Sequence, residues 1–298
     1  MDNVSSVEDL LLVLKDKYNY CDELLAFLNK LVPALIHTYG VDKKGLIFNS
    51  LIDCEIHIQP IGENPEDYYN GYYGFNRKLD LPFIVGGIHH DELMLDENGN
   101  VFDRQMIYLR TDNIVDKKFD FNNKNNLACI VHEVCHLVKS YNRLLVDGDK
   151  VYTYCGMIKT GHKYDSESKQ FVETGRVNVG LEEALNCCDE EDIMTMLIGE
   201  SYQTKAYKDS CNFIRCFLEN PEFRNALRDT QFNYGEDWKN VLGVEASDAL
   251  VNSFDTLVNL YYVSGYEWHK HKEEYRKKRQ DSYDCLQGIL NNINNKVR

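Results

Sequence analysis

Long apolar runs are missing from this sequence. No stretch approaches the roughly 18 consecutive apolar residues that a membrane-spanning helix requires. The opening residues, MDNVSSVED, also lack the basic start and the continuous apolar segment of a signal peptide. We therefore expect a soluble, cytoplasmic protein without a membrane partner.

Positive charge and proline are also scarce. Asp and Glu number 48 against 33 Lys and Arg, so the formal net charge is −15. Such a chain repels a phosphate backbone except at a local basic patch, so we expect no nucleic acid as the main partner. With five prolines and 43% hydrophobic residues, the composition is that of a globular chain long enough to bury a stable core.

The ten cysteines include no C-x-x-C pair and show none of the spacings of a structural zinc site. Several fall on apolar faces of predicted helices, where a thiol acts as a small hydrophobic group. We interpret them as buried free thiols in a reducing compartment, with a redox-active pair as the alternative for Cys187 and Cys188.

Residues 126–141 are the most informative stretch, because an H-E-x-x-H motif runs from His132 to His136 inside an apolar run with helical spacing. Two histidines four residues apart on a helix differ by about 40° around its axis, so both imidazoles reach one point in space. Glu133 is close enough to act at that point. Burying these three polar groups without a metal would be costly, so a catalytic zinc site is favoured over an ordinary buried helix.

Helical periodicity predicts helices over residues 6–18 and 22–39, and again over 193–219, 247–268 and 270–294.

The middle of the chain has the composition of strands. Residues 44–61 are rich in β-type residues, and a turn signal at 96–100 separates an apolar run at 81–85 from a strand-like run at 101–110. The last two runs are predicted to form a hairpin.

Four other segments receive simpler interpretations. His89 and His90 are predicted to lie in a surface loop, because adjacent residues on an extended chain point in opposite directions. Residues 144–174 are predicted to be a loop or hairpin excursion, and the acidic run at 189–192 to cap the next helix. The basic run at 270–279 is predicted to be a solvated helix face, with docking of an acidic partner as the alternative.

Two histidines need one more ligand, since catalytic zinc takes three protein ligands and leaves the fourth position for water. The H-E-x-x-H-x-x-G-x-x-H continuation is absent, because residue 142 is Asn and the next histidine is His162. A carboxylate on a later helix is therefore expected. Residues 181–186, L-E-E-A-L-N, offer Glu182 and Glu183.

In these two helices the sequence resembles the gluzincins, the thermolysin-like and toxin-like zinc metallopeptidases. Their third ligand is a Glu in a string such as L-N-E-G/A-L-T or I-N-E-A-I-S, and this register gives Glu183 the ligand position, with Glu182 as its rival. The resemblance implies a zincin-like fold, bound Zn²⁺ and hydrolysis of peptide bonds. It also implies an acidic residue four positions after the ligand to orient a zinc-bound histidine, where this sequence has Cys187.

The resemblance has three further implications. A hydrogen-bond donor to the transition state is expected, and Arg176, Tyr202 and Tyr207 are the candidates. Residues 103–110 are a candidate for the edge strand that pairs with an extended substrate. The G-x-M-E-N segment of gluzincin aminopeptidases is absent from the sequence, which favours an endopeptidase.

We predict a single mainly helical α+β domain over residues 1–298 with a zincin-like fold. Helices occupy residues 1–43, a small antiparallel sheet and the metal-site helices occupy 44–215, and further helices occupy 216–298.

The predicted function is zinc-dependent cleavage of a peptide or protein substrate. His132, His136 and Glu183 would hold the zinc, and Glu133 would act as general base. One alternative is a zincin-like binding or structural protein with little or no proteolytic activity. Another is a helical interaction module in which the motif lies on an ordinary buried helix.

Overall fold

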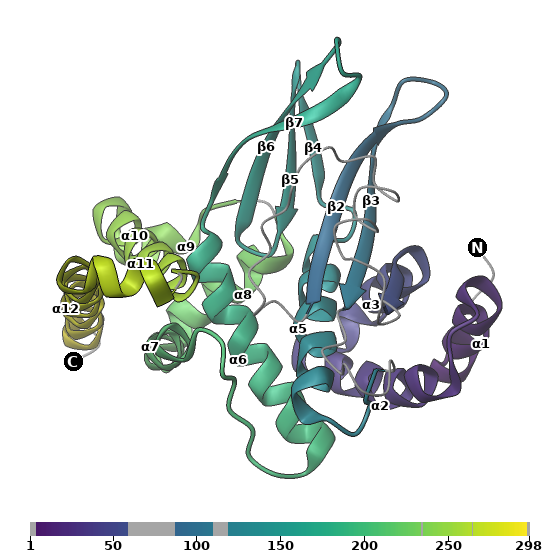
Figure 1. Cartoon of the computed structure of the whole chain (residues 1–298), viewed down its shortest axis with the longest axis horizontal. Helices are drawn as coiled ribbons and strands as arrows, with labels where there is room; N and C mark the ends of the chain where they lie inside the picture. Colours follow the sequence, from purple (N-terminus) through teal and green to yellow (C-terminus); the bar gives the residue numbers. More distant parts are fainter. Residues whose placement is uncertain (1–3, 59–86, 110–118, 234, 264, 297–298) are drawn as a thin grey trace. The chain divides into compact units, whose positions relative to one another are not determined.

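The computed structural model describes residues 4–58, 87–109, 119–233, 235–263 and 265–296 (Figure 1). The chain divides into two compact units. The first comprises Met1–Tyr141 and Asp192–Ser201, and the second comprises Asn142–Glu191 and Tyr202–Arg298. Most of the secondary structure is helical, with two small sheets, which confirms the predicted α+β class. The single domain over residues 1–298 stays a prediction.

The first unit begins with α1 (Val7–Tyr18) and α2 (Asp22–Tyr39), as predicted. A capping box starts α1. The Ser6 hydroxyl accepts a hydrogen bond from the Asp9 backbone N–H at 3.1 Å, and the Asp9 carboxylate accepts one from the Ser6 backbone N–H at 3.0 Å. Two of the donors that every helix start leaves unsatisfied are thereby paired.

The short helix η1 (Val41–Lys43) and α3 (Lys44–Asp53) follow, so the strand predicted over residues 44–61 is wrong for its first part. Ile47, Phe48 and Leu51 lie on one side of α3 and are buried. Burial of this apolar side explains why a run of β-type residues is helical here. Within the described part of this run, which ends at Ile58, the extended segment is β1 (Glu55–Ile58), and residues 59–61 lie outside the described residues.

The first sheet contains β1, β2 (Gly87–Leu95) and β3 (Val101–Leu109), in the order β1-β3-β2. β2 and β3 form an antiparallel hairpin, whereas β1 is parallel to β3, so this sheet is mixed rather than antiparallel. β3 is central, which makes the prediction of an edge strand at 103–110 wrong. The run at 81–85 lies outside the described residues.

His89 and His90 belong to β2, so the predicted surface loop is also wrong. β2 is an edge strand, and it contacts α5 (Lys124–Ser140), which carries the H-E-x-x-H motif.

The second unit contains an antiparallel sheet in which four strands follow one another in chain order: β4 (Leu144–Asp147), β5 (Lys150–Cys155), β6 (Ile158–Asp165) and β7 (Gln170–Val177). The segment 144–174 is therefore a series of hairpins, one of its two predicted forms. β5 buries every second residue, as expected for a strand with one face toward a core.

Helices make up the rest of the second unit. They are α6 (Val179–Ile198), α7 (Lys208–Leu218), α8 (Pro221–Phe232), α9 (Trp238–Leu242), α10 (Val244–Tyr261), α11 (Gly265–Lys270) and α12 (Lys272–Lys296).

These bounds confirm the last predicted helix and correct three other expectations. The helix predicted over 193–219 is two helices, and so is the one predicted over 247–268. The acidic run at 189–192 lies inside α6 and does not cap the next helix. The division between the two units also falls within α6, after Glu191. Within the described part of the chain, the helices are too short or too polar to cross a membrane.

Candidate metal centre

The motif helix α5 begins at a polar cap and is buried along most of its length. The side chain of Asn123 accepts a hydrogen bond from the Asn125 backbone N–H at 2.9 Å. Apolar residues on several sides of the helix are fully buried, and His136 and Glu133 are buried among them. His132 is partly buried. The motif therefore lies where water access is restricted.

Glu133 is held by the neighbouring edge strand. Its Oε2 accepts a hydrogen bond from the backbone N–H of His89 on β2 at 2.7 Å. The His89 imidazole stacks on His136, with ring centroids 6.5 Å apart and an interplanar angle of 22°. The Nε2 atom of His89 lies 3.3 Å from the Ser140 hydroxyl, one turn after His136 on α5. A residue outside the motif thus supports two residues within it.

Burial lowers the pKa of His89 to about 3, and the neighbouring His136 contributes in the same direction. A hydrogen bond with Gln105 opposes this shift. The His89 imidazole is therefore neutral at physiological pH. Sequence reasoning missed this residue because it assigned the histidine pair to a loop, and G-I-H-H-D-E-L-M-L lacks the apolar–polar alternation that marks a strand.

Local packing determines where α6 begins. Asn178 has a positive φ of 64°, and its side-chain amide donates to the Met157 carbonyl at 3.1 Å. Gly180 lies against α10. A Cβ at this position would be 2.3 Å from the carbonyl carbon of Phe254, so a larger residue does not fit. The backbone N–H of Gly180 donates to Asp255 Oδ1 at 2.5 Å.

Glu182 is buried in the core and accepts hydrogen bonds there. It is fully buried, and its Oε2 accepts a hydrogen bond from the Met157 backbone N–H at 2.8 Å. The side-chain amide of Gln231 lies 3.1 and 3.2 Å from its two carboxylate oxygens. Gly156 has a φ of 58° and no space for a side chain, because a Cβ at this position would lie 2.2 Å from the Glu182 carboxylate. The Glu182 carboxylate is thus part of the core next to the β5–β6 turn.

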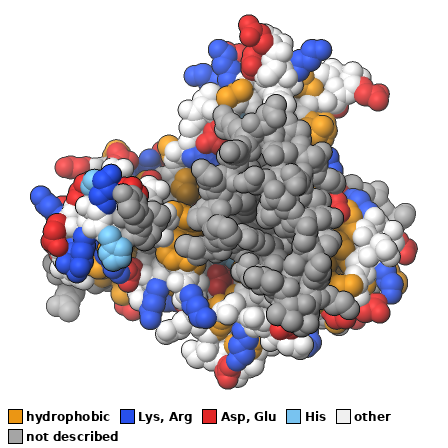
Figure 2. Space-filling model, in the orientation of Figure 1, with side chains coloured by type: hydrophobic (Ala, Val, Ile, Leu, Met, Phe, Trp, Pro, Cys, Tyr) orange, Lys and Arg blue, Asp and Glu red, His pale blue; other side chains and the backbone are white. Residues whose placement is uncertain are grey.

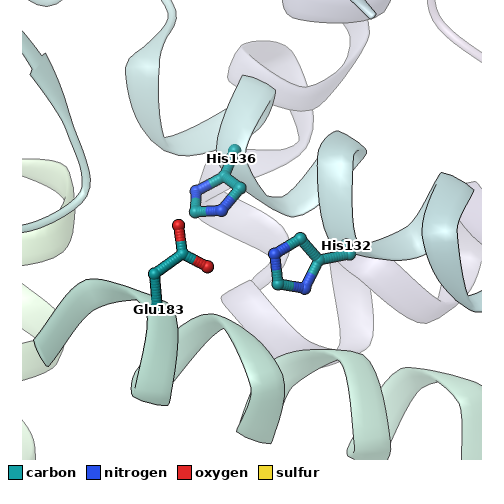
Figure 3. A group of neighbouring side chains, drawn as sticks. All are labelled: His132, His136 and Glu183. Atoms are coloured by element: carbon teal, nitrogen blue, oxygen red, sulfur yellow. The ribbon is translucent and has the colours of Figure 1, made fainter. Parts of the chain in front are cut away.

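Glu183, the next residue on α6, lies near the two histidines of the motif. One nitrogen of His132, one nitrogen of His136 and one carboxylate oxygen of Glu183 all lie within 4.8 Å of one another. Figure 3 shows the two imidazoles and the Glu183 carboxylate facing a common point. Two imidazoles and a Glu are the ligands of one known class of catalytic zinc site.

His132 also belongs to a second group of potential metal ligands. One atom each of His132, Cys187 and Glu190 lie within 4.8 Å of one another. Cys187 and Glu190 follow Glu183 by four and seven residues, so the three side chains share one side of α6. Glu190 is buried. The resemblance to gluzincins implies a carboxylate at position 187. In this chain the carboxylate near His132 is that of Glu190, about one helical turn later.

The candidate transition-state donors differ in their surroundings. Arg176 lies on β7, is exposed, and pairs with Glu173 at 3.0 Å. Tyr202 precedes α7 and is not on a helix, contrary to expectation. Tyr207 is the N-cap residue of α7, and burial raises its pKa, with the negative charge of Glu183 as the next largest cause. Tyr207 is therefore close enough to the proposed ligand Glu183 to be affected by its charge.

Comparison with known proteins finds no matching family model, no matching curated protein and no matching solved structure. The resemblance to gluzincins stays a prediction that rests on residues of α5 and α6.

Proposed function

We propose that this protein is a zinc-dependent metalloendopeptidase that hydrolyses a peptide bond in a peptide or protein substrate. One observation supports this most: the donor atoms of His132, His136 and Glu183 converge beside Glu133 of the H-E-x-x-H motif. We also propose that the packing of α5 on β2 and β3 belongs to a zincin-like fold.

Bound zinc would lower the pKa of a water molecule and polarise the substrate carbonyl. Glu133 accepts the proton of the attacking water and passes it to the leaving amine. The hydrogen bond from the His89 backbone to Oε2 fixes the orientation of this carboxylate. Tyr207 is proposed as the donor that stabilises the developing oxyanion, because its buried hydroxyl, which contacts the Tyr262 hydroxyl, is near enough to Glu183 for that carboxylate to raise its pKa.

Glu190 is proposed to orient His132 by accepting a hydrogen bond from the ring nitrogen that does not bind the metal. Carboxylates in this role fix the orientation of a ligating imidazole and raise its basicity. Glu190→Gln should therefore weaken zinc binding by about 10–100-fold. Cys187→Ser, which alters the other member of the group, should change zinc affinity far less.

The decisive experiment measures zinc content and peptide cleavage separately. Wild type should contain close to one zinc per chain, a Glu133→Gln variant should retain the metal, and a Glu183→Ala variant should bind it much more weakly. Cleavage of a peptide library should disappear in Glu133→Gln and in the presence of a chelator. A wild-type protein that binds no zinc would overturn the proposal.

The same measurements separate the alternative function. A zincin-like binding or structural protein would contain zinc but would show no difference between wild type and Glu133→Gln on any peptide.

A further inference from the structure

The sheet of the second unit presents a cationic and aromatic surface. Residues directly opposite each other in an antiparallel pair share one face. Between β5 and β6 these pairs are Lys150 with Lys163, Tyr152 with Gly161, and Tyr154 with Lys159. We call the surface formed by Lys150, Lys159, Lys163, Tyr152 and Tyr154 the lysine–tyrosine face.

The lysine–tyrosine face is the solvent side of the sheet. The alternate residues of the same strands, which point to the opposite side, are buried; they include Val151, Thr153, Cys155 and Thr160. On the lysine–tyrosine face, Lys150 and Lys163 are exposed and the other three residues are partly buried.

Positive charges outnumber negative ones on this face, where Lys150, Lys159 and Lys163 stand against Asp147 on β4 and Asp165 on β6. Lys150 stands directly opposite Lys163, a like-charge pair that destabilises a sheet. Asp147 on β4 is opposite Lys150 in register, and it forms no ion pair with Lys150 at 4.0 Å or less. Across the residues that the structure describes, none of the three lysines forms an ion pair. This imbalance occurs in a chain whose net charge is −15.

The basic run on α12 provides the contrast. Arg276 pairs with Glu273 at 3.2 Å, Lys278 with Glu274 at 2.7 Å, and Arg279 with Asp209 of α7. Figure 2 accordingly shows basic and acidic side chains interspersed over α11 and α12. Much of the charge on α12 is therefore balanced locally, as expected for a solvated helix face.

Aromatic rings and a cavity complete the lysine–tyrosine face. The Lys159 ammonium lies 4.3 Å from the centroid of the Tyr152 ring and 5.9 Å from that of Tyr154. The Tyr152 ring lies beside Gly161 on the opposite strand, where a Cβ would be 3.6 Å from its Cε1 atom. Tyr154 and Lys159 also line a cavity of about 150 Å³. The cavity is lined further by one basic and one acidic residue, Arg143 and Glu236, and by Gly156, Met157, Asn178, Thr230, Gly235 and Trp238.

We propose that the lysine–tyrosine face binds an acidic polypeptide segment, a run of Asp and Glu residues laid across β5 and β6. The three ammonium groups would pair with carboxylates, and the tyrosine rings would pack against the aliphatic parts of the same side chains. The cavity would take one side chain. A nucleic acid fits less well, because its dense backbone charge is repelled by the rest of this acidic protein. This proposal does not depend on the metal centre.

Fluorescence anisotropy of a labelled poly-glutamate peptide with the full-length protein tests the proposal. We expect saturable binding that weakens as salt is added. The double variant Lys150→Gln, Lys163→Gln should weaken binding by about tenfold or more. Because this variant removes a repulsive cross-strand pair, the sheet should remain folded, which circular dichroism checks.

A matched control separates the face from total charge. The variant Lys272→Gln, Lys277→Gln changes the net charge equally on exposed positions of α12 and should bind like wild type. Three results would overturn the proposal. They are no binding of poly-glutamate, an equal loss of poly-glutamate binding in both double variants, or tighter binding of a thymidine oligonucleotide that the Lys150→Gln, Lys163→Gln variant abolishes.

Discussion

The two adjacent glutamates of α6 should respond to substitution in opposite ways. In Glu182→Ala, the Met157 N–H and the Gln231 amide both lose a buried carboxylate acceptor. Hydrogen bonds to charged groups contribute about 1.5–3 kcal/mol each, so the free energy of unfolding should fall by about 3–6 kcal/mol. That is a large part of the roughly 5–15 kcal/mol that stabilises a typical domain.

Glu183→Ala should leave folding nearly unchanged and remove a metal ligand. Glu183 is only partly buried, so the free energy of unfolding of the metal-free protein should change by about 1 kcal/mol or less. Zinc affinity, measured by competition with a chromogenic chelator, should fall sharply. Urea unfolding must be measured with chelator present, because bound zinc itself stabilises the native state, by about 2.7 kcal/mol at a hundred times its Kd.

The reverse pattern would refute this reasoning. If Glu182→Ala lost zinc while its unfolding free energy stayed that of wild type, Glu182 would be the ligand. The surroundings of Glu183 would then need another explanation. If both variants lost zinc binding and both kept the unfolding free energy of wild type, Glu182 would not have the structural role argued for it.

Three further predictions concern stability. Arg228→Met should lower the free energy of unfolding in urea by about 3–5 kcal/mol, because it leaves the fully buried Asp189, now 2.6 Å from the Arg228 guanidinium, without its cation; a change within 1 kcal/mol, roughly the value for an exposed site, would contradict this role. Gly180→Ala should also destabilise the protein in the same assay, since its Cβ would meet the α10 backbone at 2.3 Å, and a neutral result would show that the helices can separate. The pKa of His89 is about 3, below its ordinary 6.5, so the unfolded chain takes up this proton first as pH falls. The free energy of unfolding of the metal-free protein should therefore drop by about 1.4 kcal/mol per pH unit below about pH 6.5, and His89→Phe should remove this part of the slope in paired urea titrations.

Sequence reasoning predicted the elements whose pattern is local. The helices α1, α2, α5 and α12 show apolar spacing or a cap that is visible in the chain itself. It failed at α3, where tertiary burial of one side decides between helix and strand. Strand order was also out of reach, because nothing local shows that β1 pairs in parallel with β3 and leaves β2 at the edge.

The candidate site shows the same limit. The H-E-x-x-H spacing was sufficient to name His132, Glu133 and His136, because a helix brings them together by itself. The role of His89 depends on a strand far from α5 in the sequence, so no pattern within either segment reveals it. Glu190 was missed because its run was assigned to the start of the next helix.

The acidic residues of α6 explain why a ligand string alone is an incomplete guide. Successive residues on a helix point about 100° apart, so neighbouring carboxylates meet different surroundings. Glu182 accepts hydrogen bonds in the core, Asp189 pairs with an arginine of α8, and Glu191 pairs with one of α7. Glu183 and Glu190 remain on the side of α6 that carries the potential metal ligands. Loss of activity after substitution on this helix is therefore informative only alongside a stability measurement, because three of these five carboxylates act through the fold.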